Sequence, residues 1–186
     1  ISINKENNML SGKKILLSTV EEKNLEQLRQ WRNEPSLRRY FREYREISRT
    51  MQNRWFQKIN SDTSQVNFEI HDGHTEKLIG HCGLYYIDWT SRTGEFGIYI
   101  GDRDYRSGGY GSDTLRTLIK YGFEDLNLNR IWCEVYDNNT SIEVYKHLGF
   151  KMEGTLRQNY YNEGKFWDSH VLGMLKSEYE HKKGER

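Results

Sequence analysis

The sequence has a single proline, Pro35, and only two cysteines, Cys82 and Cys133, among its 186 residues. One proline provides no proline-rich linker that would separate domains, so we predict a single domain over residues 1–186. Two isolated cysteines are too few for a disulfide framework or a cysteine-rich metal site. We therefore predict that both thiols lie in the core, in a reducing compartment, and that no metal is bound.

Long apolar runs and an excess of one charge are also absent. No apolar stretch approaches the roughly 20 residues that cross a membrane. The first ten residues, ISINKENNML, contain no apolar signal-peptide segment. The 28 basic and 27 acidic residues nearly cancel, which argues against nucleic-acid binding. We therefore expect a cytoplasmic protein that binds neither a membrane nor nucleic acid.

Hydrophobic periodicity predicts alternating groups of strands and helices. The strands are expected at residues 13–20, 66–72, 77–87, 94–100, 129–136, 151–161 and 165–176. Helices are expected from Leu25 until Pro35, over 51–59, after the glycines near 110, and over 141–148, where Thr140 and Glu143 match a capping box. The order β-α-α-β-β-β-α-β-α-β-β predicts an α/β (α+β) fold with a mixed, mostly antiparallel seven-stranded sheet and helices on both faces.

A glycine-rich stretch, RSGGYG at residues 106–111, joins the strand 94–100 to an amphipathic helix. A helix N-terminus leaves about four N–H groups unpaired, and glycines let a ligand approach them, so such a corner favours phosphate. Arg106 adds a cation. Positions 111–113 lack the Gly-Lys-Ser/Thr of a P-loop, and Thr114 replaces the third glycine of a dinucleotide fingerprint. Composition alone leaves a plain strand-to-helix turn without ligand equally open.

Two motifs together resemble those of the GNAT acetyltransferase superfamily. Residues 106–111 are similar to its pyrophosphate motif, R/Q-x-x-G-x-G/A, and residues 139–150 match N-x-S-x-x-x-Y-x-x-x-G-F of its second cofactor motif. The sequence after Lys151 is similar to the branch that contains ribosomal-protein N-terminal and spermidine acetyltransferases. The resemblance covers about residues 12–178. It implies a GNAT fold, acetyl-CoA as cofactor, and direct transfer to an amine.

The resemblance also implies which residues contact the cofactor. The pyrophosphate would lie on Arg106, Ser107, Gly108, Gly109, Tyr110 and Gly111. The pantetheine arm would run along Phe96, Gly97, Ile98, Tyr99 and Ile100, next to Asn139 and Tyr145. A backbone N–H of this strand would then stabilise the oxyanion of the thioester carbonyl. For Asn139 a plain helix cap is the alternative.

Proton transfer places two demands on the site. The departing thiolate needs a proton, and Tyr145 falls on the family's position for this acid. Its spacing from Ile142 and Leu148 equally fits a packing tyrosine. The attacking amine, with a pKa of about 10.4 if it is lysine-like, must lose a proton. Glu95 is the candidate base, directly or through water, and a solvated strand glutamate is the alternative.

The acceptor is expected near the first two helices and their connection. Residues 31–55 contain seven arginines and only three glutamates. Arginine forks suit carboxylate or phosphate, so we predict a small amine with an anionic part, such as a nucleotide-linked amino sugar. The predicted substrate contacts are Arg32, Arg38, Tyr40, Phe41 and Glu95. Alternatives are a solvated Arg-rich face, a protein N-terminal or polyamine acetyltransferase, and a non-catalytic acyl-CoA-binding module; the resemblance also allows a homodimer.

Overall fold

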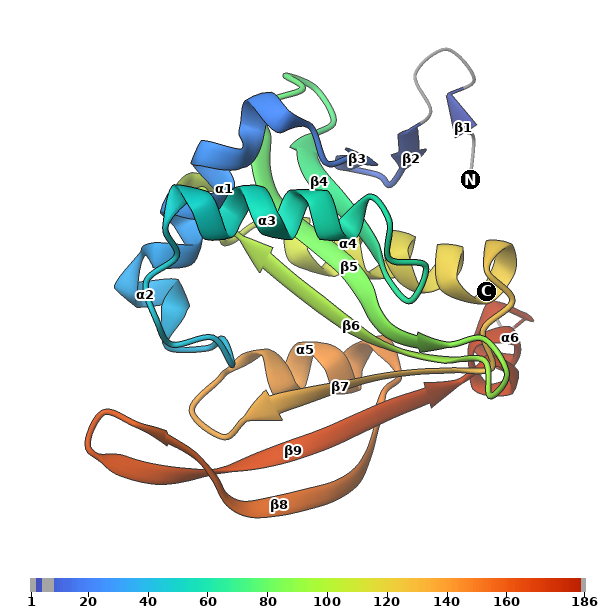
Figure 1. Ribbon diagram of the computed structural model, residues 1–186. Helices are drawn as coiled ribbons and strands as arrows, with labels where there is room; N and C mark the ends of the chain where they lie inside the picture. Colours follow the sequence, from blue (N-terminus) through green and yellow to red (C-terminus); the bar gives the residue numbers. More distant parts are fainter. Residues whose placement is uncertain (1–2, 5–8, 185–186) are drawn as a thin grey trace. The chain divides into compact units, whose positions relative to one another are not determined.

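The structure, a computed structural model, describes residues 3–4 and 9–184. The chain, coloured along its sequence in Figure 1, divides into two compact units. The first comprises Ile1–Tyr85 with Gly97–Leu118, and the second comprises Tyr86–Phe96 with Ile119–Arg186. The chain crosses between the units within β5 (Leu78–Asp88), β6 (Thr93–Ile100) and α4 (Tyr110–Lys120).

Five antiparallel strands pair in chain order in the first unit: β1 (Ile3–Asn4), β2 (Met9–Ser11), β3 (Ile15–Thr19), β4 (Val66–Asp72) and β5. Alternation along β3 buries Ile15 and Leu17, whereas Leu16 and Ser18 are only half-buried. Leu17 lies opposite Ile70, which is also fully buried, so this face of the sheet forms part of the core.

The helices of the first unit are α1 (Leu25–Asn33), α2 (Pro35–Arg38), α3 (Arg49–Ile59) and the beginning of α4, with 3-10 turns at Glu22–Asn24 and Arg103–Tyr105. Pro35 ends α1 and occupies the first turn of α2, where its missing N–H costs nothing. The Ser48 side chain caps α3 by accepting a hydrogen bond from the Met51 N–H at 3.2 Å. Leu25 and Leu28 of α1 pack with Val20, and Trp31 and Trp55 cover this cluster.

The second unit contains a parallel pair followed by an antiparallel hairpin. β6 runs parallel to β7 (Arg130–Tyr136), which pairs with β9 (Lys165–Leu175), and β9 pairs with β8 (Lys151–Asn162), as Figure 1 shows. Its helical elements are a π-helical turn (Tyr121–Asp125), α5 (Ser141–Leu148) and α6 (Lys176–Gly184). The core side chains include Phe96, Ile119, Phe123, Ile131, Cys133, Val135, Leu172 and Met174.

The predicted class, a mixed and mostly antiparallel sheet with helices, is confirmed, although the described residues contain nine strands rather than seven. The additional elements include β1, β2, α2 and α6. The capping box was wrong: Thr140 makes no side-chain cap bond, and Asn139 Oδ1 accepts from the Ser141 N–H at 2.9 Å instead. Gly149 ends α5 with a φ of 113°, a left-handed conformation that glycine adopts readily.

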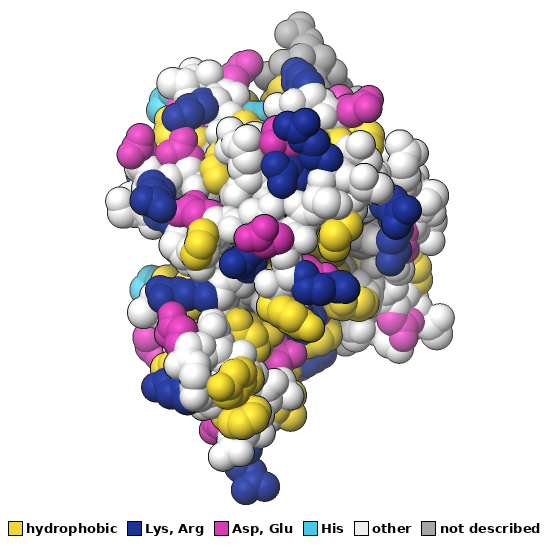
Figure 2. Space-filling view, turned by 60° about the vertical axis from the view of Figure 1, so that its left-hand side comes forward, with side chains coloured by type: hydrophobic (Ala, Val, Ile, Leu, Met, Phe, Trp, Pro, Cys, Tyr) yellow, Lys and Arg dark blue, Asp and Glu magenta, His cyan; other side chains and the backbone are white. Residues whose placement is uncertain are grey.

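Charged side chains of both signs are intermingled on the face that Figure 2 presents, in keeping with their near-equal numbers. Over the residues that the structure describes, no helix is both long and apolar enough to cross a membrane.

Candidate active site

The glycine-rich corner lies in the first unit, between the end of β6 and the start of α4. Gly108 and Gly109 have φ values of 78° and 87°, which favour glycine because a Cβ would clash with the backbone. A Cβ built on Gly109 or Gly111 would meet no atom within 4 Å. The corner is therefore strained for other residues but open on the side where the missing side chains would lie.

The start of α4 presents unpaired donors. The Asp113 N–H donates to the Gly109 carbonyl at 3.0 Å, which is where hydrogen bonding of the helix begins. Over residues 3–4 and 9–184, no backbone carbonyl accepts from the N–H groups of residues 108–112. These donors and the positive end of the helix fit a diphosphate.

Lys14, which precedes β3, supplies the corner with a cation that was not predicted from the sequence. Its Nζ donates to the Gly108 carbonyl at 2.6 Å and lies 5.4 Å from the ring centre of Tyr110. Its backbone N–H donates to Asp113 Oδ2 at 2.7 Å, which ties it to α4. Nearly 100 residues separate the partners, and no motif marks Lys14, so only the folded chain reveals it.

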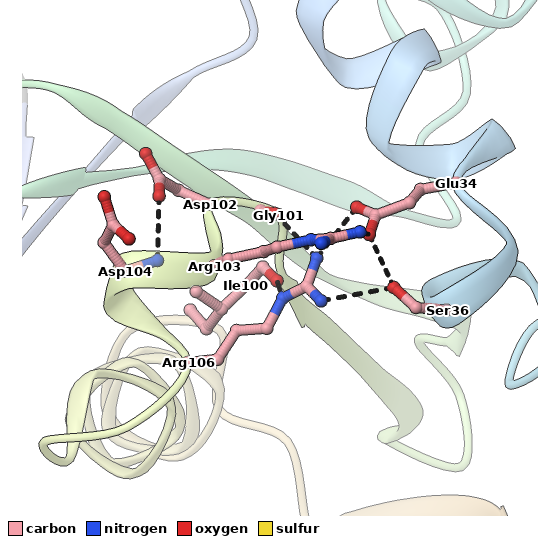
Figure 3. A network of polar contacts seen from close by, with 8 residues as sticks. All are labelled: Glu34, Ser36, Ile100, Gly101, Asp102, Arg103, Asp104 and Arg106. Carbon is pink, nitrogen blue, oxygen red and sulfur yellow. Dashed lines mark hydrogen bonds and ion pairs between the residues drawn. The ribbon is translucent and has the colours of Figure 1, made fainter.

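Arg106, predicted to face the diphosphate, points toward other groups (Figure 3). Its Nε donates to the Ile100 carbonyl at 3.1 Å and its Nη2 to the Gly101 carbonyl at 2.8 Å. Nη2 also pairs with Glu34 at 3.0 Å, and Nη1 donates to Ser36 Oγ at 3.2 Å. Four acceptors thus occupy the guanidinium, and its contact with a diphosphate stays a prediction.

The four residues WRNE at the end of α1 each contact a different part of the first unit. Trp31 packs on Gly101, where a Cβ would lie 2.0 Å from the indole, so only glycine fits. Asn33 bonds the backbone of Ile47 twice, accepting from its N–H at 2.7 Å and donating to its carbonyl at 2.9 Å. Arg32 enters a cavity, and Glu34 pairs with Arg103 and Arg106.

This cavity, of about 240 Å³, lies within the first unit and is bounded by α1, α3, their connection, β5 and β6. Aromatic rings form much of its wall. Trp55 packs edge-on against His81 at 5.5 Å, and His81 stacks on Tyr99 at 5.7 Å. The complete lining is Leu28, Arg32, Glu43, Ile47, Met51, Gln52, Trp55, His81 and Tyr99.

The charge of the cavity depends on Arg32, Glu43 and His81. Hydrogen bonds from Arg45 lower the pKa of Glu43 to about 2, so this carboxylate already has a cationic partner. The Arg32 guanidinium lies 4.2 Å from the centre of the Phe41 ring, and its Nε is buried without a hydrogen-bond partner. Burial, and then the neighbouring Arg32, lower the pKa of His81 to about 3, so the imidazole is neutral. Arg32 is therefore the cavity's unbalanced charge.

Tyr145 lies in the second unit, on α5, and is 9% exposed. Its ring packs edge-on against Phe96 at 5.1 Å and lies 6.5 Å from Phe150. Burial raises its pKa, so the hydroxyl stays protonated at neutral pH. Tyr145 therefore packs in the core of the second unit, as its alternative role predicts. Its protonated hydroxyl also meets the requirement for a general acid.

Glu95 is not the solvated strand glutamate considered as its alternative, because it is only 6% exposed. It lies on β6 opposite Trp132 of β7. Burial raises the pKa of Cys133, and the negative charge of Glu95 raises it further. Both cysteines are free and buried, as predicted.

The structure gathers part of the predicted set within each unit. In the first, Arg32 and Tyr99 line the cavity, and Phe41 contacts both. Arg38 instead pairs with Glu46 at 3.2 Å, and Tyr40 accepts a hydrogen bond from Arg39, so neither lines the cavity. The residues of interest that the sequence did not reveal are Lys14, Glu34, Glu43, Trp55 and His81.

Comparisons with known proteins agree with this arrangement. A family model described as an acetyltransferase (GNAT) domain matches residues 14–151. The N-acetyltransferase p20 of Bacillus licheniformis is 32% identical over 176 residues, which cover 91% of this chain and 97% of p20. The spermidine N(1)-acetyltransferase of Escherichia coli K12 is 27% identical over 94% of both chains.

A solved structure extends the likeness to the fold. The spermidine N-acetyltransferase of Vibrio cholerae, crystallised with CoA and spermine, has a TM-score of 0.83 at 25% identity. The match covers 89% of this chain and 98% of that one.

Proposed function

Because this chain belongs to the GNAT family of N-acetyltransferases and uses acetyl-CoA as donor, we propose that its acceptor is the primary amine of a polyamine. The observation that carries the proposal is likeness along the whole chain to spermidine acetyltransferases, 94% of each chain for the Escherichia coli enzyme. The sequence alone instead predicted a small amine with an anionic part, with a polyamine only as an alternative; the comparisons support the polyamine better.

The residues of the first unit fit the donor. Acetyl-CoA, when bound, supplies the thioester whose carbonyl carbon the amine attacks. The free N–H groups of residues 108–112 would hold its diphosphate, with Lys14 as the nearest cation. The side chains that glycine lacks at 109 and 111 leave room for this approach. The end of β6 would donate a backbone N–H to the thioester carbonyl.

Proton transfer is assigned to two buried groups of the second unit. Glu95, shielded from solvent, would accept the proton of the ammonium directly or through water. The Tyr145 hydroxyl, kept protonated by its raised pKa, would return a proton to the departing thiolate. The predicted contacts of Asn139 with the pantetheine stay a prediction, since its Oδ1 caps α5.

The cavity offers groups that suit an ammonium. The aromatic side chains of Trp55 and Tyr99 line the cavity and can attract a cation, and Glu43 contributes a carboxylate. Arg45 already pairs with Glu43 at 2.7 Å and would have to share it with the amine. The aromatic wall of the cavity therefore suits a polyamine better than do its charged side chains, Arg32 and the already paired Glu43.

One observation favours a second acceptor class, an amine that also carries a carboxylate or phosphate. Arg32 has neither a hydrogen bond nor an ion pair within the described chain, although it lines the cavity. Its guanidinium packs on the Phe41 ring, and its buried Nε lacks a hydrogen bond, so the fork has donors that an anionic group could accept from.

An amine panel with acetyl-CoA and thiol detection tests the proposal. Cadaverine and lysine form a matched pair that differs by one carboxylate, and spermidine and a peptide N-terminus complete the panel. Faster turnover of spermidine and cadaverine supports the polyamine. Faster turnover of lysine supports the second class, and activity on the peptide alone would favour a protein acetyltransferase. Binding of CoA without turnover of any amine would indicate a non-catalytic module. The homodimer and the cytoplasmic location stay predictions.

A further inference from the structure

A cluster of charged side chains joins the acceptor side of the first unit to the cofactor corner. It consists of Glu34 and Ser36, around the start of α2, and Arg103 and Arg106, between β6 and α4; we call it the Glu34 clamp. Glu34 Oε1 accepts from Arg103 and from Ser36 Oγ, the latter at 2.6 Å, and Oε2 accepts from Arg106 at 3.0 Å. About 70 residues separate the two halves of the clamp in sequence.

Glu34 is the shared member, as Figure 3 shows, because its carboxylate faces both guanidinium groups. Its side chain is only 19% exposed, whereas that of Arg103 is 73% exposed. The Glu34 carbonyl also accepts the Leu37 and Arg38 N–H groups, at 3.0 and 2.8 Å, so the same residue starts α2. The ion pairs that fix the position of Glu34 therefore also fix the start of α2, in the segment that leads from α1 toward the cavity.

Arg106 is the member on the cofactor side. Two of its contacts are carbonyls of Ile100 and Gly101, at and just after the end of β6, and Gly101 in turn supports Trp31 of α1. In this arrangement the guanidinium has little donor capacity left for a phosphate. The donors that face the corner are backbone N–H groups and Lys14.

We infer that Glu34 and Arg106 are positioning residues: their ion pair fixes α2 and the cavity relative to the end of β6, and Arg106 is not a ligand of the diphosphate. Its effect on acetyl transfer rests on the proposed function. The inference gives Arg106, which the sequence motif assigns to the cofactor, a role in acceptor binding.

The kinetic test compares two acetyl donors, acetyl-CoA and S-acetylpantetheine, which has the thioester and the pantetheine arm but no diphosphate. Glu34→Gln and Arg106→Gln should each raise the KM for the amine about tenfold and lower kcat/KM by the same factor with both donors. The double variant should lose less than the product of the two single losses, because both single variants remove the Glu34–Arg106 ion pair. Glu46→Gln, which removes the exposed pair with Arg38 in the same segment, is the control and should change little.

A loss in Arg106→Gln that is confined to acetyl-CoA, with Glu34→Gln unchanged or improved, would show that Arg106 binds the diphosphate and would overturn the inference. Hydrogen exchange provides a readout that needs no turnover. Both clamp variants should speed exchange of the Leu37 and Arg38 amides about tenfold or more, and Glu46→Gln should not. Unchanged exchange in Arg106→Gln would refute the clamp, whereas an inactive wild-type protein with the expected exchange would refute only the proposed function.

Discussion

The glycine corner and the cavity lined by Arg32 lie in the same unit but offer a ligand different kinds of group. The corner offers backbone N–H groups at the start of α4, and its residues matter mostly for the side chains they lack. The cavity offers side chains drawn from five places in the sequence, with Arg32 as its unbalanced charge. A site made of backbone N–H groups can be identified in the sequence from glycines in one short stretch. A site made of side chains from distant elements has no such local sequence pattern.

The two regions also tolerate change differently. A diphosphate bound to backbone N–H groups is insensitive to most side-chain substitutions, except those that fill the space left by glycine. A cavity formed by side chains changes its preference with each of them. Substitutions in the corner should therefore abolish binding of the donor, and substitutions in the cavity should alter the choice of acceptor.

Gly109→Glu should have the largest effect. Its φ of 87° makes a side chain cost about 1–2 kcal/mol, and the carboxylate would lie where the diphosphate is expected. We expect acetyl-CoA affinity, measured by calorimetry, to fall at least about a hundredfold. Gly164→Glu is the control, because Gly164 has a φ of 78° and equally open surroundings in the turn between β8 and β9. If Gly109→Glu kept its affinity for acetyl-CoA, the glycine corner would not be the diphosphate-binding site.

Tyr145→Phe should alter the chemistry and leave both regions intact. Loss of the hydroxyl should lower kcat about 100-fold or more with the affinity for acetyl-CoA unchanged, since general acids contribute about 100- to 10,000-fold. Tyr136→Phe is the control, because Tyr136 is also buried in the second unit, stacked on Tyr160 at 3.8 Å. Equal rates for Tyr145→Phe and the wild type would leave Tyr145 with a packing role alone.

The contrast between the regions explains what the sequence could predict. Periodicity located most elements, because burial on one face repeats every 2 or 3.6 residues; α5 matches its predicted range, Ser141–Leu148. Short elements without such a repeat, such as β1 and α2, were missed. The corner was found through its glycines. His81 and Trp55 were not identified as site residues, because contacts between distant elements follow from the fold and have no local pattern.

Some predictions stay open for the same reason. The single domain over residues 1–186 stays a prediction. The catalytic roles of Glu95 and Tyr145 also stay predictions, because they depend on contacts with substrate that no local sequence pattern reveals. The protonation argument supports Tyr145, and burial removes the solvated alternative for Glu95. The turnover of Tyr145→Phe decides between the catalytic and the packing role of Tyr145.

Arg32→Gln should have a smaller effect, on preference rather than on activity. Removing the cavity's unbalanced cation should raise kcat/KM for cadaverine relative to lysine about tenfold, because a fork for an anionic group is lost. Arg54→Gln, an exposed position on α3, is the matched control. If the ratio of kcat/KM for cadaverine to that for lysine stayed unchanged, Arg32 would not contact the acceptor. The charge of Arg32 would then not distinguish the cavity from the glycine corner.

His71→Gln should have the smallest effect, on stability alone, since His71 lies in neither region. Its Nε2 is 3.1 Å from Glu69 Oε2, and this hydrogen bond is the main reason that the pKa of His71 is raised. A raised pKa in the folded state means that the stabilisation is complete below about pH 6.5 and is lost as the pH rises through the raised value. Denaturant unfolding at several pH values should show this loss of stability with rising pH in the wild type and in the control His74→Gln. If this loss persisted in His71→Gln, the pair with Glu69 would not be its origin.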